Sequence, residues 1–333
     1  MLNPKKNVLV IGGTGIVGKP VVMRLLGEGK YNIYSIALEE ANFPSTVTQY
    51  VVDRTTEEYV KIIERLNSEI DVWDAVIDIV SFSEESARST YTLFKNDAQH
   101  IITLSTSLVY NREAKNLDPI SEDVDLAPEG SFGGYVDGKV KLERFWKSVT
   151  DVNWTLLRPY HILGAESLLG CIPEHNRDPK IIQRIRNCES LKLCNGGDIE
   201  FNYVHPKDIA VAISKIIGQP KTFKQAYNLV NPKAVFAKDY YAEIAKQIGC
   251  TIKIENIPMD VVWGEMKGWE MTTLPHVYSM QKMQNDIGFT PNISLDECIS
   301  DAIKYPAVVS ENIIPVHQRM NKLPQPNKIS WLR

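Results

Sequence analysis

A tyrosine and a lysine four residues apart could form a proton-transfer pair. Tyr135 and Lys139 lie in the stretch FGGYVDGKVKLERFW, and positions i and i+4 share one face of a helix. A free tyrosine has a pKa of about 10, and a nearby ammonium favours its phenolate. Gly138 lies between them, although glycine costs about 1 kcal/mol relative to alanine inside a helix. The spacing predicts a proton-transfer pair, and two solvent-facing residues are the alternative.

A hydroxyl on the preceding strand would complete a proton-transfer site with this tyrosine and lysine. The segment LSTSLVY offers Ser105, Thr106 and Ser107. A hydroxyl at this place could hydrogen-bond the same substrate oxygen that exchanges its proton with the tyrosine. The residue types alone leave all three open.

Three glycines near the N-terminus predict a phosphate-binding turn. Gly12, Gly15 and Gly18 follow the apolar run NVLVI and precede a helical pattern. In such turns the first glycine permits a tight bend, the second lets the backbone approach a pyrophosphate, and the third lets helix and strand pack closely. The N-terminus of the following helix presents free N–H groups to anionic oxygens. A glycine-rich turn that binds nothing is the alternative.

The elements that would position these residues alternate between strand and helix patterns. Strands are expected at 7–13, 32–38, 48–53, 74–80, 100–107 and 153–159, with helices at 15–29, 55–68, 83–96 and 138–149. Strands that are apolar throughout and separated by helices are typical of a parallel sheet covered on both faces. The fold class expected is therefore α/β, a Rossmann-type doubly wound parallel sheet.

The regular alternation of strand and helix patterns ends after Pro159. We expect an NAD(P)-binding Rossmann domain at 1–165, to which 200–230 returns with a short strand, a helix and the strand QAYNLVN. A smaller C-terminal α/β substrate-binding region, 166–199 and 231–320, would pack over the carboxyl ends of the strands. From about Lys233 the chain reads mainly as helices with one strand, TIKIENI, and 321–333 reads as a C-terminal extension.

Composition excludes several classes of function. The 333 residues are 44% hydrophobic and 23% charged, with a net charge of −4, so no attraction to nucleic acid is expected. No apolar run reaches the roughly 18 residues of a membrane span. Five cysteines without a C-x-x-C pair predict no metal site and a reducing, cytoplasmic location.

The glycine spacing G-x-x-G-x-x-G resembles the extended short-chain dehydrogenase/reductase superfamily, in particular its NAD-dependent epimerase/dehydratase family. The segments VVDRT, VIDIVSFS, TLLRPYHILG, YVHPKDIA and DIGFTPNISLDECISDAI are similar to family motifs in the same order. The resemblance covers roughly residues 6 to 305.

The resemblance implies a catalytic set of Thr106, Tyr135 and Lys139. Thr106 is selected because the family hydroxyl stands four residues before the tyrosine of a pattern completed here by Val109 and Tyr110. Tyr135 would take the proton of a substrate hydroxyl while hydride passes to the nicotinamide. Ser107 and His161 are expected to contact substrate. The cofactor-binding residues implied are Gly12, Thr14, Gly15, Ile16, Val17, Gly18, Asp53, Arg54, Ile79, Val80, Ser105, Lys139 and Pro159.

The cofactor expected is NAD, with NADP as the alternative. The segment YSIALEE has no basic residue to meet a 2′-phosphate, and Glu39 and Glu40 would repel one. The alternative interpretation is that both glutamates lie in a loop, face solvent and contact no cofactor. The partner expected is a small-molecule substrate, and a homodimer is left open.

Two departures from the family pattern narrow the reaction. Ser107 and Leu108 stand where sugar-nucleotide dehydratases of the family carry Asp-Glu, and leucine cannot move a proton. Phe201 replaces an arginine that usually meets the substrate diphosphate. We therefore expect hydride transfer at a secondary alcohol or ketone of a small, polyhydroxylated substrate. A nucleotide-sugar 4-epimerase is the alternative, and a non-catalytic dinucleotide-binding or RNA-associated relative is the alternative of another class.

Overall fold

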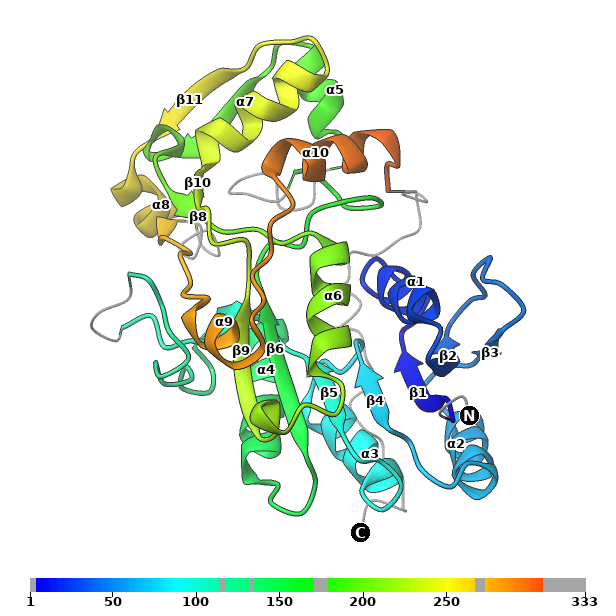
Figure 1. Cartoon of the computed structure of the whole chain (residues 1–333). Coiled ribbons are helices and arrows are strands. Elements are labelled where there is room, and N and C mark those ends of the chain that lie inside the picture. Colours follow the sequence, from blue (N-terminus) through cyan, green and yellow to red (C-terminus); the bar gives the residue numbers. More distant parts are fainter. Residues whose placement is uncertain (1–3, 114–117, 132–133, 171–178, 267–272, 308–333) are drawn as a thin grey trace.

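A seven-stranded parallel sheet forms the centre of the molecule (Figure 1). The computed structural model describes residues 4–113, 118–131, 134–170, 179–266 and 273–307. The strand order is β3-β2-β1-β4-β5-β6-β9, with every neighbouring pair parallel. The strands are β1 (Lys6–Ile11), β2 (Tyr31–Ala37), β3 (Val47–Val51), β4 (Ala75–Asp78), β5 (Ile101–Leu104), β6 (Trp154–Pro159) and β9 (Gln225–Leu229). The predicted Rossmann-type fold is confirmed.

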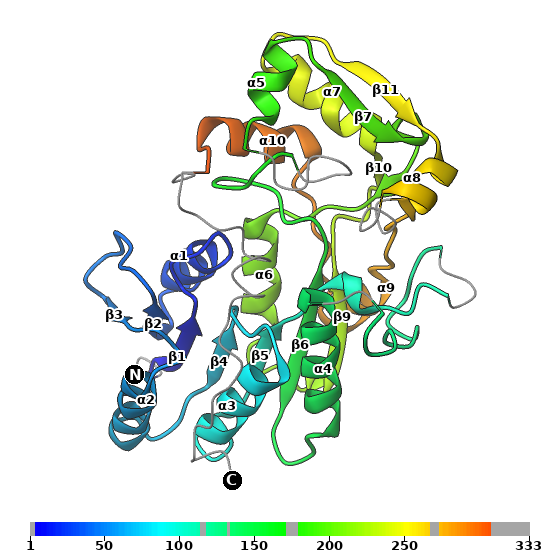
Figure 2. The same cartoon turned by 180° about the vertical axis from the view of Figure 1, so that it is seen from behind.

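Helices cover both faces of the sheet because its strands are apolar on both sides. In β1, Val8 and Val10 face one core cluster, while Leu9 and Ile11 face the other. The first cluster includes residues of α1 (Gly18–Glu28), α6 (Pro206–Ile216) and α9 (Gln281–Ile287). The second includes residues of α2 (Glu57–Glu69), α3 (Glu84–Phe94) and α4 (Gly134–Ser148), seen from behind in Figure 2.

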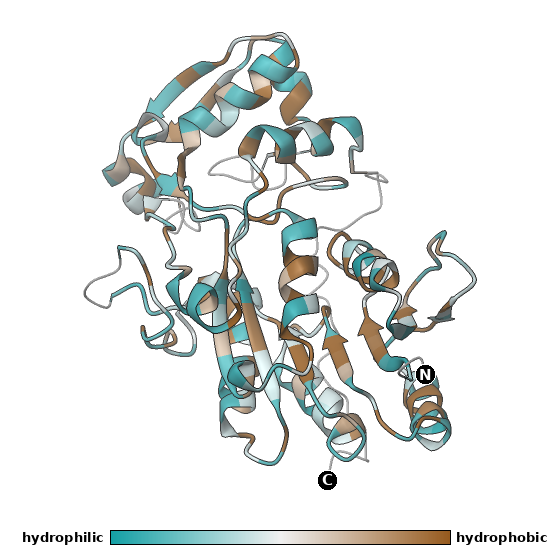
Figure 3. Ribbon diagram, in the orientation of Figure 1, coloured by the Kyte–Doolittle hydropathy of each residue, from teal (hydrophilic) through white to brown (hydrophobic). Residues whose placement is uncertain are grey.

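Local sequence signals set several helix ends. Thr56 caps α2 by accepting the N–H of Tyr59, and Glu57 and Glu58 occupy the first turn. The helix α1 ends at Gly29, whose left-handed backbone (φ 68°) favours glycine. Figure 3 shows the resulting pattern, with the most hydrophobic residues on the strands of the sheet.

A smaller region lies over the carboxyl ends of the strands (Figures 1 and 2). Its core joins residues from several segments between Leu163 and Ala302. Its elements are α5 (Ile181–Arg186), β7 (Ser190–Cys194), η2 (Asn195–Gly197), β8 (Glu200–Phe201), β10 (Val235–Phe236), α7 (Ala237–Gln247), β11 (Lys253–Ile257), α8 (Met259–Glu265) and α10 (Leu295–Lys304). Two further short helices are η1 (Ser107–Val109) and η3 (Pro220–Thr222).

The prediction of one strand in the last part of the chain was incomplete. The predicted strand, β11, pairs in parallel with β7, and β10 pairs with β8. The sequence reading assigned no strand to β7, although SLKLC alternates exposed and buried positions as a half-buried strand does. The predicted extension 321–333 lies outside the described residues.

The outer edge of β9 is covered by side chains. Glu122 Oε1 accepts the Asn228 N–H at 2.8 Å, and Lys282 Nζ donates to the Ala226 carbonyl at 3.0 Å. These contacts occupy backbone groups that would otherwise be free to pair with another strand.

In the described part of the chain, no helix is long and apolar enough to cross a membrane.

Candidate active site

The glycine turn after β1 has the geometry that a phosphate loop needs. Gly12 has a left-handed backbone (φ 89°), and a Cβ on Gly18 would lie 2.0 Å from the Gly12 carbonyl oxygen. Both positions therefore require glycine. Gly15 is different: it is exposed, and a Cβ there would meet nothing closer than the Gly12 carbonyl oxygen at 3.6 Å. The turn thus keeps open backbone at the start of α1.

The other residues predicted for this turn divide by exposure. Thr14 and Val17 are buried, while Ile16 is exposed. Val17 precedes α1 and makes no side-chain cap, so no protein side chain closes the N-terminus of that helix at this position. At the start of α1, the Lys19 N–H donates to the Gly15 carbonyl at 2.9 Å and Pro20 has no N–H, so the Gly18 N–H is the one that a ligand oxygen could accept.

The predicted cofactor-binding residues Asp53 and Arg54 point in different directions. Asp53 is exposed, and its Oδ1 accepts both the N–H and the hydroxyl of Thr55 at 2.8 Å. Arg54 turns inward and donates to Asp78 Oδ1 at 2.8 Å and to the Thr90 hydroxyl at 3.0 Å. Glu39 and Glu40 are exposed beyond the end of β2.

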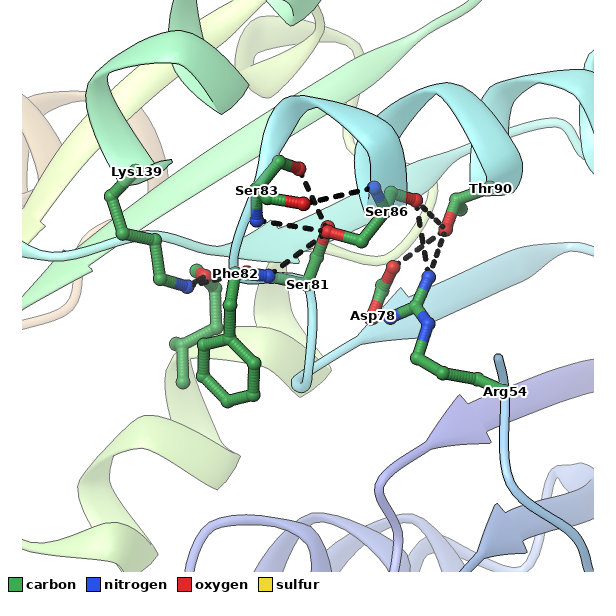
Figure 4. Close-up of polar contacts among 9 residues, drawn as sticks. Arg54, Asp78, Ser81, Phe82, Ser83, Ser86, Thr90 and Lys139 are labelled. Carbon is green, nitrogen blue, oxygen red and sulfur yellow. Dashed lines mark hydrogen bonds and ion pairs between the residues drawn. The ribbon is translucent and has the colours of Figure 1, made fainter. Parts of the chain in front are cut away.

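Asp78 connects these residues to the end of β4. Its side chain is fully buried, and Oδ2 accepts the Thr90 hydroxyl at 2.6 Å (Figure 4). The next residues, Ile79 and Val80, follow β4 at the carboxyl edge of the sheet, and Val80 Cγ1 would lie 2.6 Å from a Cβ on Gly12. The predicted cofactor residues 12, 79 and 80 therefore lie together.

Lys139 is buried between the ends of β4 and β5. Its Nζ donates to the carbonyl of Ser81 at 2.6 Å and to that of Leu104 at 2.5 Å. Burial lowers the pKa of Lys139 to about 7, against the opposing negative charges of Asp78 and Glu143. The ammonium has three N–H donors, so one remains for a ligand after these two bonds.

The Ser86 hydroxyl fixes the turn that holds Lys139. It accepts the N–H groups of Phe82 and Ser83, each at 3.0 Å (Figure 4). The Phe82 ring lies 4.8 Å from Lys139 Nζ.

Tyr135 lies in the first turn of α4, on the face that carries Lys139. Lys139 Nζ is 5.8 Å from the centre of the half-buried Tyr135 ring. Gly138 explains how the helix comes this close to the 81–83 turn, because a Cβ there would lie 2.5 Å from the Phe82 carbonyl oxygen. Glycine within α4 is therefore required by packing.

Thr106 follows β5, two residues beyond the Leu104 carbonyl that holds Lys139. It is buried, and its Oγ1 accepts the Leu108 N–H at 3.3 Å at the start of η1. Thr106 and Lys139 are thus both held at the end of β5, and Tyr135 lies one turn of α4 from Lys139. The catalytic set of Thr106, Tyr135 and Lys139 stays a prediction.

The hydroxyls of Ser105 and Ser107 point into the protein. Ser105 donates to Glu143 Oε1 at 2.6 Å, and Ser107 donates to the Arg158 carbonyl at 2.6 Å. Both residues are buried. A cofactor contact by Ser105 or a substrate contact by Ser107 would have to use the backbone or exchange these bonds.

A buried network that the sequence reading missed lies beneath these serines. Arg158 and Glu143 are fully buried and ion-paired at 2.5 Å, and Arg158 Nη1 donates to the Tyr110 hydroxyl at 2.8 Å. Burial raises the pKa of Glu143, but the charge and hydrogen bonds of Arg158 outweigh it, so the net shift is downward. An arginine inside the apolar strand TLLRP was the sequence signal for a buried counter-charge.

His161 and Pro159 lie at the end of β6. Pro159 is its last residue, and His161 has a left-handed backbone (φ 39°). The His161 ring lies 5.3 Å from both the Phe201 and the Tyr240 rings. Phe201 is itself buried among apolar residues, so this position supplies no charge.

Among the described residues, no group of three or more His, Cys, Asp or Glu side chains is placed to hold a metal ion.

A family model described as the NAD dependent epimerase/dehydratase family matches residues 8–229. The chain belongs to this family. Membership confirms the resemblance drawn from the sequence and agrees with the expectation of NAD, on which the family depends.

Solved structures of this fold extend over nearly the whole chain. An epimerase of Methanothermobacter thermautotrophicus has 14% identity and a TM-score of 0.71, covering 91% of this chain and 92% of that one. A UDP-glucose 4-epimerase of Thermotoga maritima, with UDP-glucose, has 16% identity and a TM-score of 0.69 (90% and 98%). A UDP-glucuronic acid 4-epimerase of Bacillus cereus, in complex with NAD, has 14% identity and a TM-score of 0.68 (90% and 98%). No curated protein matches the sequence.

Proposed function

We propose that this family member is an NAD-dependent oxidoreductase or epimerase acting at a secondary alcohol or ketone of a small, polyhydroxylated substrate. The observation that carries the proposal is the placement of Tyr135 and Lys139 on one face of α4, with Lys139 held at the ends of β4 and β5. The same edge of the sheet carries the open glycine turn.

The residues of the turn fit a dinucleotide. Gly15 leaves open backbone for a pyrophosphate, and the Gly18 N–H at the uncapped start of α1 could donate to it. Asp53 is exposed and could contact the adenine, and the remaining N–H of Lys139 could meet a ribose hydroxyl. NAD, when bound, supplies the hydride acceptor or donor.

The proposed chemistry of the protein is proton transfer. Tyr135 takes the proton of the substrate hydroxyl, and the Thr106 hydroxyl hydrogen-bonds the same oxygen. The positive charge of Lys139 favours the phenolate of Tyr135. Reversal of the same steps on the other face of the resulting ketone would give epimerisation, and release of the ketone would give net oxidation.

A nucleotide-sugar 4-epimerase is the second candidate. It is favoured by the similarity in fold to 4-epimerases of UDP-glucose and UDP-glucuronic acid. The uncharged Phe201 supplies no cation for a diphosphate at its own position.

The substitution Tyr135→Phe tests the proposal. It keeps the ring and removes the titrating hydroxyl, so turnover should fall by about 10²–10⁴-fold while NAD affinity stays within about twofold. Turnover of sugars, sugar nucleotides and ketones would be followed by nicotinamide absorbance and by product analysis, which detects epimerisation without net redox change.

Tyr305→Phe is the matched control, because Tyr305 is exposed at the end of α10. It should leave turnover unchanged. A Tyr135→Phe protein that binds NAD and retains full turnover would show that the proton-transfer assignment is wrong.

A further inference from the structure

Arg54, which the resemblance assigns to the cofactor, directs its guanidinium into the protein (Figure 4). Nη1 donates to Asp78 Oδ1 at 2.8 Å, and Nη2 donates to the Ser86 carbonyl at 3.1 Å and to the Thr90 hydroxyl at 3.0 Å. The Arg54 side chain is 13% exposed, and that of Asp78 is fully buried. Both terminal nitrogens of the guanidinium are therefore engaged by acceptors on β4 and α3.

The first turn of α3 also holds the loop that follows β4. The Ser86 hydroxyl donates to the Ser83 carbonyl at 2.7 Å and accepts the N–H groups of Phe82 and Ser83 at 3.0 Å each. The Ser81 hydroxyl lies 3.0 Å from it, and Ser81 is the donor because the one hydroxyl proton of Ser86 is already used. Ser86 thus contacts every residue of the 81–83 turn.

The 81–83 turn sets the place of Lys139. The Ser81 carbonyl accepts a hydrogen bond from Lys139 Nζ at 2.6 Å, and the other acceptor is the Leu104 carbonyl at the end of β5. Lys139 is 1% exposed, so protein acceptors rather than bulk water hold its ammonium. A continuous path of hydrogen bonds and short backbone links therefore runs from Arg54 to Lys139.

The ion pair at the start of this path also acts on Lys139 through its charges. Burial lowers the pKa of Lys139 to about 7; the negative charge of Asp78 opposes this shift, and the positive charge of Arg54 adds to it. Arg54 is thus linked to the lysine both by contacts and by electrostatics.

We propose that Arg54 is a positioning residue for Lys139. Through Ser86 it fixes the 81–83 turn, and the turn fixes the ammonium beside Tyr135. A direct contact between Arg54 and the cofactor is the alternative, and the inward direction of its hydrogen bonds favours the indirect role. This inference deepens the proposed function and rests on it.

Ser86→Ala tests the proposal without changing any charge. It removes the hydroxyl that holds the turn, but it keeps the carbonyl that Arg54 meets and the Ser83 cap of α3, so the protein should fold. At saturating NAD, kcat should fall by about tenfold or more, because a misplacement of about 1 Å can cost about 10²-fold in rate. The affinity for NAD, measured by calorimetry, should change less than kcat does. Ser86→Thr, which restores the hydroxyl, should recover most of the rate.

The pKa of Lys139 gives a second readout, which needs no substrate. It is measured by an NMR titration of cofactor-free protein with isotope-labelled lysine, in which Lys139→Met assigns the signal. Hydrogen bonds to an ammonium favour its charged form, so loosening the Ser81 acceptor in Ser86→Ala should lower this pKa below its wild-type value. If Tyr135→Phe kept full turnover, the proposed function would fail, whereas this pKa would still report on the positioning.

Arg54→Lys applies the test at the start of the path. A lysine keeps a positive charge beside Asp78 but presents one ammonium in place of a planar fork, so the contacts with α3 weaken. Again kcat should fall more than the affinity for NAD does. If Arg54 contacted the cofactor instead, the affinity for NAD would fall and kcat at saturating NAD would stay unchanged.

Asn67→Ala is the matched control, because Asn67 is also a polar link to α3 but lies at the amino edge of the sheet. Its Nδ2 donates to the Leu93 carbonyl at 2.7 Å, and its Oδ1 accepts the Trp73 indole N–H at 2.9 Å. The variant should lose stability, while kcat and the pKa of Lys139 stay as in the wild type.

Two results would overturn the proposal. One is a weaker affinity for NAD with unchanged kcat in Arg54→Lys, which would make Arg54 a cofactor contact. The other is a loss of stability alone in Ser86→Ala, with kcat and the pKa of Lys139 unchanged, which would make the network a structural link like that of Asn67.

Discussion

Arg158→Met should destabilise the protein strongly. Arg158 and Glu143 both have 0% side-chain exposure, and Arg158 donates to both carboxylate oxygens, from Nε at 2.8 Å and from Nη2 at 2.5 Å. Removing Arg158 leaves the buried carboxylate with the Ser105 hydroxyl as its remaining hydrogen-bond donor among the described contacts. Breaking a buried pair in this way costs about 3–5 kcal/mol, because the other charge stays buried and uncompensated.

The pH dependence of stability should change sign at this site. In the wild type, burial raises the pKa of Glu143 but Arg158 brings it below its ordinary value, so the site stabilises the fold above the unfolded pKa of about 4.3 and loses this contribution as the pH falls. In Arg158→Met only the burial remains, which raises the pKa of Glu143. The variant should therefore lose stability as the pH rises from about 4.3 towards neutrality.

Urea unfolding at several pH values measures both effects. Arg88→Gln is the surface control, because its pair with Glu84 on α3 is exposed and should contribute less than about 1 kcal/mol. The double variant Glu143→Leu/Arg158→Met should recover most of the loss, since it leaves no unpaired charge. A loss below about 1 kcal/mol for Arg158→Met, or no recovery in the double variant, would refute the reasoning.

Three further predictions concern the cofactor site. Gly15→Val should fold, because a Cβ at this position meets nothing closer than 3.6 Å, but calorimetry should show NAD affinity reduced by about tenfold or more; unchanged affinity in the folded variant would reject the phosphate loop. The same titration of the wild type should show tighter binding of NAD than of NADP. Burial lowers the pKa of Lys139 to about 7, so without cofactor the folded protein releases a proton that the unfolded chain holds up to a pH of about 10.4. The free energy of unfolding should therefore rise between pH 7 and about 10.4, by up to about 1.4 kcal/mol per pH unit. Urea unfolding of Lys139→Met at pH 7 to 9 should lack this rise. An identical rise in the variant would show that it does not come from Lys139.

Local patterns predicted the sheet and the glycine turn well. Each strand of a buried parallel sheet is apolar on both faces, so the run NVLVI identifies β1 without tertiary information. The roles expected of Gly12 and Gly18 follow from backbone geometry that only glycine tolerates, and the structure shows that geometry. The assignments to Thr106, Tyr135 and Lys139 stay predictions until they are tested by substitution.

The polar partners beneath the site could not be predicted in the same way. Arg54 and Asp78 are 24 residues apart, and their pairing depends on how β3 and β4 are arranged in the sheet. Ser105 and Ser107 have the residue type of ligand contacts, yet their hydroxyls point inward towards Glu143 and Arg158. The direction of a short side chain at a strand end is set by packing, which a linear pattern does not encode.

The late position of β9 in the chain has a consequence for synthesis. Strand β6 ends at Pro159, and its partner β9 begins only at Gln225. A nascent chain that has released β6 from the ribosome exposes the unpaired backbone of that strand while the intervening segment is still being made. Translation proceeds at about 5–20 residues per second, so this edge stays open for several seconds. During that interval the growing chain offers a site for chaperone binding or for mispairing with a neighbouring nascent chain.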